Sequence, residues 1–207
     1  LTEILYRFMD VPGYNQTYVN QYNFGNYVDM LLMGKTSRGG WVAINCIPTA
    51  VHTIAGALVG KYLMSKEPAK TKLLLIWGIA TLAIGYGMDL AGITPIIKRI
   101  ATSSFTIVSL GWCLLGLAAC YFYVDVKGNK QGLNFFGVLG MNSIFIYLFF
   151  EIVGGKWFNG YVSAIAEGLL HRFIAENGIG IISSIAIFFI EWKLCEFLYK
   201  KKIFFRL

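Results

Sequence analysis

Ten polar or ionisable residues lie in or beside the long apolar stretches of this chain of 207 residues. A charged or hydrogen-bonding group inside a membrane is costly, so it usually faces a cavity or a partner and is a candidate for function. The ten substrate-binding candidates are Asn45, His52, Asp89, Lys98, Arg99, Ser103, Ser104, Asn142, Ser143 and Glu151. They offer both charge signs and several hydrogen-bonding groups, a combination that suits a hydroxyl-rich ligand such as a sugar.

Catalytic machinery is harder to find among these residues. Nucleophilic or general-base catalysis of group transfer needs a base or nucleophile and an oxyanion stabiliser within reach of each other. His52 is the only histidine inside an apolar stretch, and no partner stands at triad-like spacing from it. A lone histidine of this kind is more often a hydrogen-bond partner between helices. We therefore assign no catalytic residue in this chain.

Metal and nucleotide chemistry have no sequence support. Four cysteines lie in apolar segments without C-x-x-C spacing or a histidine cluster, which is typical of small buried residues rather than metal ligands: Cys46, Cys113, Cys120 and Cys195. The sequence also lacks a phosphate-binding loop and a dinucleotide fingerprint. We expect no metal.

The composition indicates an integral membrane protein. The chain is 57% hydrophobic and 14% charged, with a mean hydropathy of +0.61. Soluble domains carry about 25% charged residues, so this chain lacks the polar surface that water requires. Its net charge of +7 comes from Lys and Arg between apolar runs rather than from a basic stripe. Such charges commonly flank membrane spans, and we expect no nucleic-acid partner.

Five apolar windows predict an all-α bundle of about five transmembrane helices. Each window holds about 20 residues, which suffices to cross a bilayer core about 30 Å thick. The windows are residues 42–64, 71–91, 101–124, 133–153 and 178–199. Residues 161–175 are amphipathic, and too short and too charged to span, so we expect an interfacial helix there. Polar and small residues recur at steps of three or four along each span, a pattern typical of helix packing.

The N-terminal part of the chain is expected to differ from this bundle. Residues 1–9 (LTEILYRFM) are interpreted as the end of a truncated transmembrane helix, and residues 10–41 as an outward-facing polar loop. Residues 42–207 would form the membrane bundle. On this interpretation the chain is a piece of a longer protein.

The charge distribution predicts a cytoplasmic C-terminus. Eleven Lys and Arg residues, among them residues 200–202 and Arg206, fall on the C-terminal side of the membrane, and seven fall on the other side. This orientation brings the polar candidates of four segments toward the outer leaflet. Asp89 and Glu151 lie near span ends, where pairing with Lys98 and Arg99 is an open structural alternative to ligand binding.

Several motifs resemble one known family. Residues 95–105 (PIIKRIATSSF) place a proline and two basic residues before a Thr-Ser-Ser-Phe run, and residues 140–144 (GMNSI) are followed by Tyr147 and Glu151. Residues 11–13, 25–29 and 47–50 add shorter matches. The pattern resembles the heparan-α-glucosaminide N-acetyltransferase-like family over most of the chain. It departs from the family at Ala101, where members have tryptophan, and at Phe150, where lysosomal members have histidine.

The resemblance implies the C-terminal half of a polytopic acyltransferase, of which the bacterial relatives are mostly uncharacterised. Lysosomal members pass acetyl from cytosolic acetyl-CoA to a terminal glucosamine across the membrane, with a catalytic histidine in the N-terminal half. The resemblance therefore implies a catalytic residue upstream of Leu1, and this chain alone would be inactive. Its partners would be the bilayer of a bacterial inner membrane, the upstream helices and a sugar or glycan acceptor, with a homo-oligomer left open. Two alternatives remain: a transporter or channel of small polar solutes with His52, Asp89 and Glu151 lining the path, and a non-catalytic scaffold.

Overall fold

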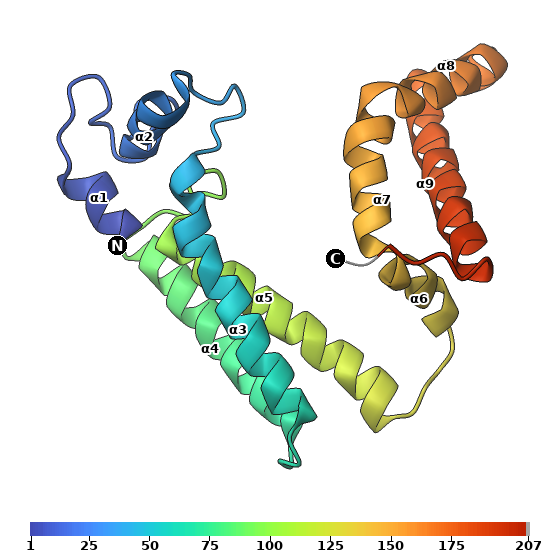
Figure 1. Ribbon diagram of the computed structural model, residues 1–207, viewed down its shortest axis with the longest axis horizontal. Coiled ribbons are helices and arrows are strands. Elements are labelled where there is room, and N and C mark those ends of the chain that lie inside the picture. The colour runs from blue at the N-terminus through green and yellow to red at the C-terminus, as the bar shows by residue number, and fades with distance from the viewer. Residues whose placement is uncertain (206–207) are drawn as a thin grey trace. The chain divides into compact units, whose positions relative to one another are not determined.

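The computed structural model describes residues 1–205, which are helical with no strand in that range (Figure 1). Arg206, counted in the charge bias above, lies outside the described residues. The chain divides into two compact units, Leu1–Asn129 and the part from Lys130 onward, here called unit 1 and unit 2.

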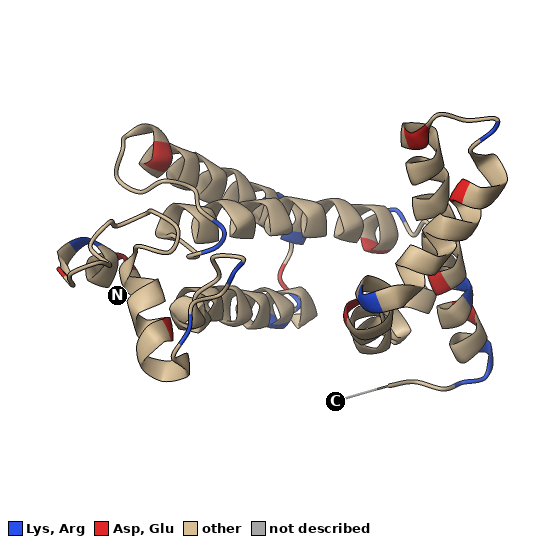
Figure 2. Cartoon of the chain, turned by 90° about the horizontal axis from the view of Figure 1, so that it is seen from above, with Lys and Arg blue, Asp and Glu red and all other residues tan. Residues whose placement is uncertain are grey.

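Four helices are long and apolar enough to cross a membrane. They are Ala43–Met64, α4 (Lys70–Leu90), Ser103–Val126 and α9 (Glu176–Lys200). The first consists of the 3-10 turn η1 (Ala43–Asn45) and α3 (Cys46–Met64). The third consists of α5 (Ser103–Tyr121) and the π-helical η2 (Phe122–Val126). Four of the five predicted spans are thereby confirmed. The charged residues of α4 are confined to its two ends, at Lys70, Lys72 and Asp89, and α5 contains none (Figure 2).

Unit 1 is organised around the α4–α5 pair, which packs through glycines. A Cβ atom at Gly85 would lie 2.5 Å from Val108 Cγ2, and one at Gly78 would lie 2.7 Å from Leu115 Cδ2. A Cβ at Gly111 would meet Leu82 and Thr81 at 2.8 Å. Because these positions lack side chains, the two backbones approach closely, as small residues allow in membrane helices.

A second core of unit 1 joins the N-terminal segment to the loop between α4 and α5. It consists of the buried residues Tyr6, Phe24, Val42 and Ile100. Tyr6 belongs to α1 (Thr2–Phe8), and Phe24 begins α2 (Phe24–Met33). These contacts fix the N-terminal segment against the end of the bundle.

The helix α2 corrects the expectation of a continuous polar loop at 10–41. Asn23 caps it, because its side chain accepts a hydrogen bond from the Asn26 backbone N–H, and Gly34 ends it in the left-handed conformation with φ of 65°. One face of α2 is buried, so tertiary packing stabilises a helix in a segment rich in Asn, Tyr and Gly.

In unit 2 the span predicted at 133–153 is present as a bent pair of helices, which makes a fifth span if the two parts cross the membrane together. The helix α6 (Leu133–Met141) ends at Asn142, and the helical run Ser143–Leu170 leaves it at a bend of 72°. Asn142 has φ of −126° and ψ of 33°, outside the helical region. Its buried side chain accepts a hydrogen bond from the Phe205 backbone N–H at 3.2 Å. The segment after α9 is thus attached at Phe205 to the break between α6 and α7.

The run after Asn142 contains three parts. α7 (Ser143–Phe149) leads into the π-helical η3 (Phe150–Phe158), and α8 (Asn159–Leu170) follows without a break in helical structure. α8 departs from the direction of α7 and packs against α9 (Figure 1). The interfacial helix predicted at 161–175 therefore coincides largely with α8 but ends at Leu170, and its depth in a bilayer stays a prediction.

Candidate functional site

The loop between α4 and α5 is held by polar side chains from both helix ends. Asp89 Oδ1 accepts a hydrogen bond from the Ile96 N–H at 3.1 Å. The hydroxyls of Thr102 and Ser104 both donate to the Pro95 carbonyl, at 2.6 Å and 2.7 Å. Thr102 and Ser104 are almost fully buried. Two of the candidates, Asp89 and Ser104, therefore shape the loop that carries Lys98 and Arg99.

Glu3 links α1 to the first residue of α5. Its Oε2 lies 3.4 Å from both the backbone N and the hydroxyl of Ser103. Because the N-terminus of a helix carries a partial positive charge, a carboxylate at this position is stabilised. Ser103 is thus brought to charged and polar side chains that the sequence analysis did not associate with it, since its partner is a residue 100 positions earlier.

Arg7 and Tyr18 complete this cluster. The Tyr18 hydroxyl donates to Glu3 Oε1 at 2.5 Å, and Arg7 Nε lies 3.1 Å from the Tyr18 oxygen and 3.4 Å from Glu3 Oε1. Partial burial, and then the hydrogen bond to Glu3, raise the pKa of Tyr18. We call Glu3, Arg7, Tyr18 and Ser103 the Glu3 cluster.

Two cationic candidates lie on the surface of the same loop. Lys98 Nζ lies 5.5 Å from the centre of the Trp41 ring, within the range of a cation–π contact. The Arg99 carbonyl accepts a hydrogen bond from Asn45 Nδ2 at 2.5 Å, and the Arg99 side chain is exposed. Trp41 is also exposed. This end of unit 1 thus presents two cations and an aromatic face.

His52 lies apart from these groups, within α3. Its Nε2 is 2.8 Å from Ser109 Oγ on α5. Ser109 Oγ also lies 3.1 Å from the Thr106 carbonyl, to which its hydroxyl donates, so His52 Nε2 is best placed as the donor to Ser109. His52 borders an apolar groove of about 340 Å³ that Gly56 and Cys113 also line. The geometry is that of a hydrogen bond between helices.

The remaining three candidates belong to unit 2. Asn142 is buried at the helix break, whereas Ser143 and Glu151 are exposed. Glu151 lies in η3, a π-helical segment.

The N-terminal helices contain buried polar residues that sequence reasoning missed. The Tyr6 hydroxyl, the Asn26 amide and Asp29 Oδ2 are enclosed without a hydrogen-bond partner among residues 1–205. Asp29 Oδ1 accepts from the Ala43 N–H at 2.8 Å and so ties α2 to the start of the first span. The i, i+3 spacing of Asn26 and Asp29 was a signal that they share a helix face.

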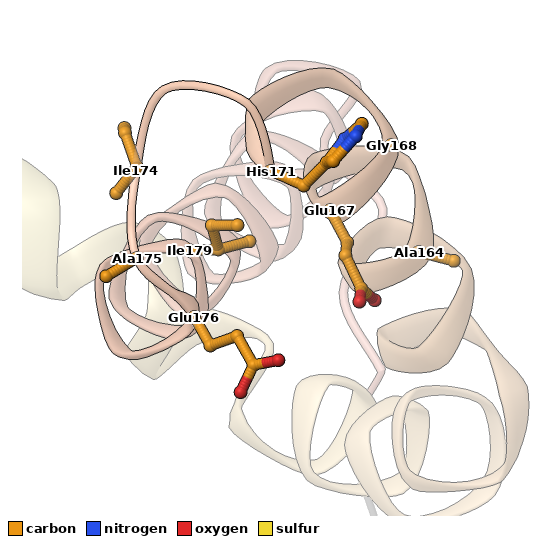
Figure 3. A pocket seen from close by; sticks show the side chains of 8 residues that line it. All are labelled: Ala164, Glu167, Gly168, His171, Ile174, Ala175, Glu176 and Ile179. Carbon is orange, nitrogen blue, oxygen red and sulfur yellow. The ribbon is translucent and has the colours of Figure 1, made fainter.

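A cavity of about 720 Å³ lies between α8 and α9 of unit 2 and is lined by Glu167, His171 and Glu176 among others (Figure 3). The two carboxylates extend to one side of it, and the His171 ring points away from both. No three His, Cys, Asp or Glu side chains among the described residues are arranged to hold a metal ion.

Comparison with protein-family models and comparison with curated proteins each give no match to this chain. The resemblance therefore depends on its motifs alone, chiefly those at 95–105 and 140–151.

Proposed function

We propose that this chain is the membrane part of an acyltransferase that moves an acetyl group from acetyl-CoA to a sugar or glycan, and that the Glu3 cluster and its neighbours bind the acceptor. The observation that carries the proposal is the meeting of polar side chains from separate segments at one end of unit 1. Glu3 comes from α1, Tyr18 from the segment before α2, and Ser103 from α5.

The chemistry of this end suits a saccharide. A carboxylate, a guanidinium and a phenol can each exchange hydrogen bonds with sugar hydroxyls, and the exposed ring of Trp41 offers an apolar face beside them. The proposed acceptor carries negative charge, because Lys98 and Arg99 are exposed at this end and would attract it.

The topology supports an outward-facing acceptor site. The first residues of α3, the last of α4 and the first of α5 belong to the same end of unit 1, because consecutive helices alternate in direction. With the C-terminus in the cytoplasm, as the charge bias predicts, and with the bent pair of α6 and Ser143–Leu170 crossing as a fifth span, that end would face outward from a bacterial inner membrane. The catalytic base and the acetyl-CoA site would be supplied by residues upstream of Leu1.

The test is acetyl transfer by the full-length gene product in liposomes, with labelled acetyl-CoA on one side and amino sugars or glycans on the other. The variant Arg99→Gln should raise the KM for the acceptor several-fold while changing kcat little, because Arg99 contacts the acceptor and not the acyl group. Glu67→Gln, an exposed substitution in the α3–α4 loop, is the matched control.

Each alternative outcome has a distinct meaning. If intact protein neither binds coenzyme A nor acetylates any glycan tested, the proposal fails. Solute or ion flux through the same liposomes would favour a transporter, and the absence of both transfer and flux would favour a scaffold.

A further inference from the structure

Glu191 is a carboxyl group enclosed within a span. It lies in α9, nine residues before Lys200, or about 14 Å along the helix at 1.5 Å per residue. Its side chain is 9% exposed, and Oε1 has no hydrogen-bond partner among residues 1–205. An unneutralised carboxylate at this depth is costly, so its presence marks a candidate site.

A second unpartnered oxygen lies beside it. A Cβ atom placed on Gly154 would be 3.4 Å from Glu191 Oε1 and 3.5 Å from Asn159 Oδ1, so both oxygens flank the same small space. Asn159 Oδ1 is also buried without a partner in the described chain. Gly154 belongs to η3, and π-helical segments are frequent at functional sites. A carboxyl oxygen and an amide oxygen, with Asn159 Nδ2 at 3.7 Å from the same point, therefore surround a position left open by a glycine.

The elements around Glu191 supply no compensating charge within the described residues. On α9, Lys193 and Lys200 both pair with Glu196, and Cys195 is a buried thiol. α6 has no titratable side chain, and the titratable groups of α7, η3 and α8 are all exposed: Tyr147, Glu151, Lys156, Tyr161 and Glu167. Among the described residues no ion pair reaches Glu191, so a bound cation would supply the charge that its carboxylate lacks.

We propose that Glu191 and Asn159 form a binding site for one small monovalent cation, a proton or a sodium ion. A proton would join a Glu191 oxygen, and the resulting O–H would donate to Asn159 Oδ1. A sodium ion would instead be held between the carboxylate and the amide oxygen. Both neutralise the carboxyl group, and the site acts independently of acyl transfer.

The test is labelling by dicyclohexylcarbodiimide, which adds to a protonated carboxyl group in an apolar site to form a stable N-acylurea with no leaving group. The full-length protein in detergent is labelled across a pH series, in sodium chloride or in choline chloride at equal ionic strength, and the modified peptide is identified by mass spectrometry. We expect labelling at Glu191 that falls as pH rises. Suppression by sodium but not by choline identifies sodium as the occupant, and equal labelling in both salts identifies the proton.

Variants separate this site from general carboxyl reactivity. Glu191→Gln should abolish the label, whereas Glu151→Gln, which removes an exposed carboxyl from η3, should leave it intact. Absence of labelling at Glu191 in the native protein at every pH and in both salts would overturn the proposal, because a permanently paired carboxylate behaves in that way. The native-protein series decides this even if Glu191→Gln fails to fold.

Discussion

His52 of α3 and Ser109 of α5 are joined by a hydrogen bond of 2.8 Å between Nε2 and Oγ. The two residues are 57 positions apart and connect helices that otherwise share few contacts. Every residue of α3 retains some exposure, so this bond and the one from Asn45 to the Arg99 carbonyl are specific attachments of α3 to its neighbours.

Removing this bond should weaken the attachment of α3. Interhelical hydrogen bonds in membranes contribute about 0.6 kcal/mol on average and up to about 1.7 kcal/mol. We expect a double-mutant cycle of His52→Ala and Ser109→Ala, followed by unfolding in mixed micelles, to give a coupling in this range. The same cycle with Thr53→Ala, an exposed neighbour on α3, should give none. Zero coupling for His52 and Ser109 would show that the bond contributes nothing.

Gly85→Ala should destabilise the α4–α5 pair. The added methyl would lie 2.5 Å from Val108 Cγ2 and 3.1 Å from the Ser104 carbonyl oxygen, so backbone or side chains must move, at a cost of about 1–3 kcal/mol. Gly87→Ala, two residues later in the same helix, meets nothing within 4 Å and is the matched control. Equal unfolding free energies for the two variants would contradict the close packing.

Tyr18 should give unit 1 an alkaline transition. Its pKa is raised in the folded protein, chiefly by burial and then by its hydrogen bond to Glu3. The folded state therefore holds the phenol proton more tightly than the unfolded state. The stabilisation is fully present below the unfolded pKa of about 10 and is lost as pH rises through the folded pKa.

The measurement is tyrosinate absorbance during titration of the native protein and of Tyr18→Phe. The difference between the two curves should show a group that ionises above the ordinary tyrosine range, and the alkaline fall in stability should shrink in the variant. Tyr22→Phe removes a more exposed tyrosine nearby and serves as the control. A Tyr18 difference curve centred at the ordinary value would refute the expectation.

Asn142→Ala should release the C-terminal segment. The substitution leaves the Phe205 N–H without its acceptor, and loss of such a partly buried hydrogen bond costs about 0.5–1.5 kcal/mol. We expect faster tryptic cleavage at Lys201 and Lys202, measured by mass spectrometry. Ser143→Ala, at the exposed neighbouring position, should cleave at the native rate. If both variants are cleaved alike, the Asn142 side chain does not anchor the segment.

The spans were predictable because hydrophobicity over about 20 residues is a local property of the sequence. The predicted 71–91 and 178–199 windows match α4 and α9 to within two residues at each end. The helix α2 was missed although its signals were present, with Asn23 before it and Gly34 after it, because the surrounding polar residues resemble a loop.

The break at Asn142 and the Glu3 cluster could not be predicted in the same way. The partner of Asn142 is 63 residues later in the chain, and the partner of Glu3 on α5 is 100 residues later. Such pairs arise from tertiary packing, which one sequence does not reveal. Asn45, Asp89 and residues 98–104 lie near one end of unit 1 because they adjoin helix ends that alternate in direction, and their role in binding a ligand stays a prediction.

The glycine contacts between α4 and α5 also bear on how the protein is made. Both helices and the loop that joins them are complete when the ribosome has passed residue 126. Since their contacts come from neighbouring parts of the chain, the pair can assemble as a hairpin as soon as both helices have entered the membrane. Close packing at Gly78, Gly85 and Gly111 would then shield one side of each helix from lipid during insertion, leaving the other side as the first surface that the bilayer meets.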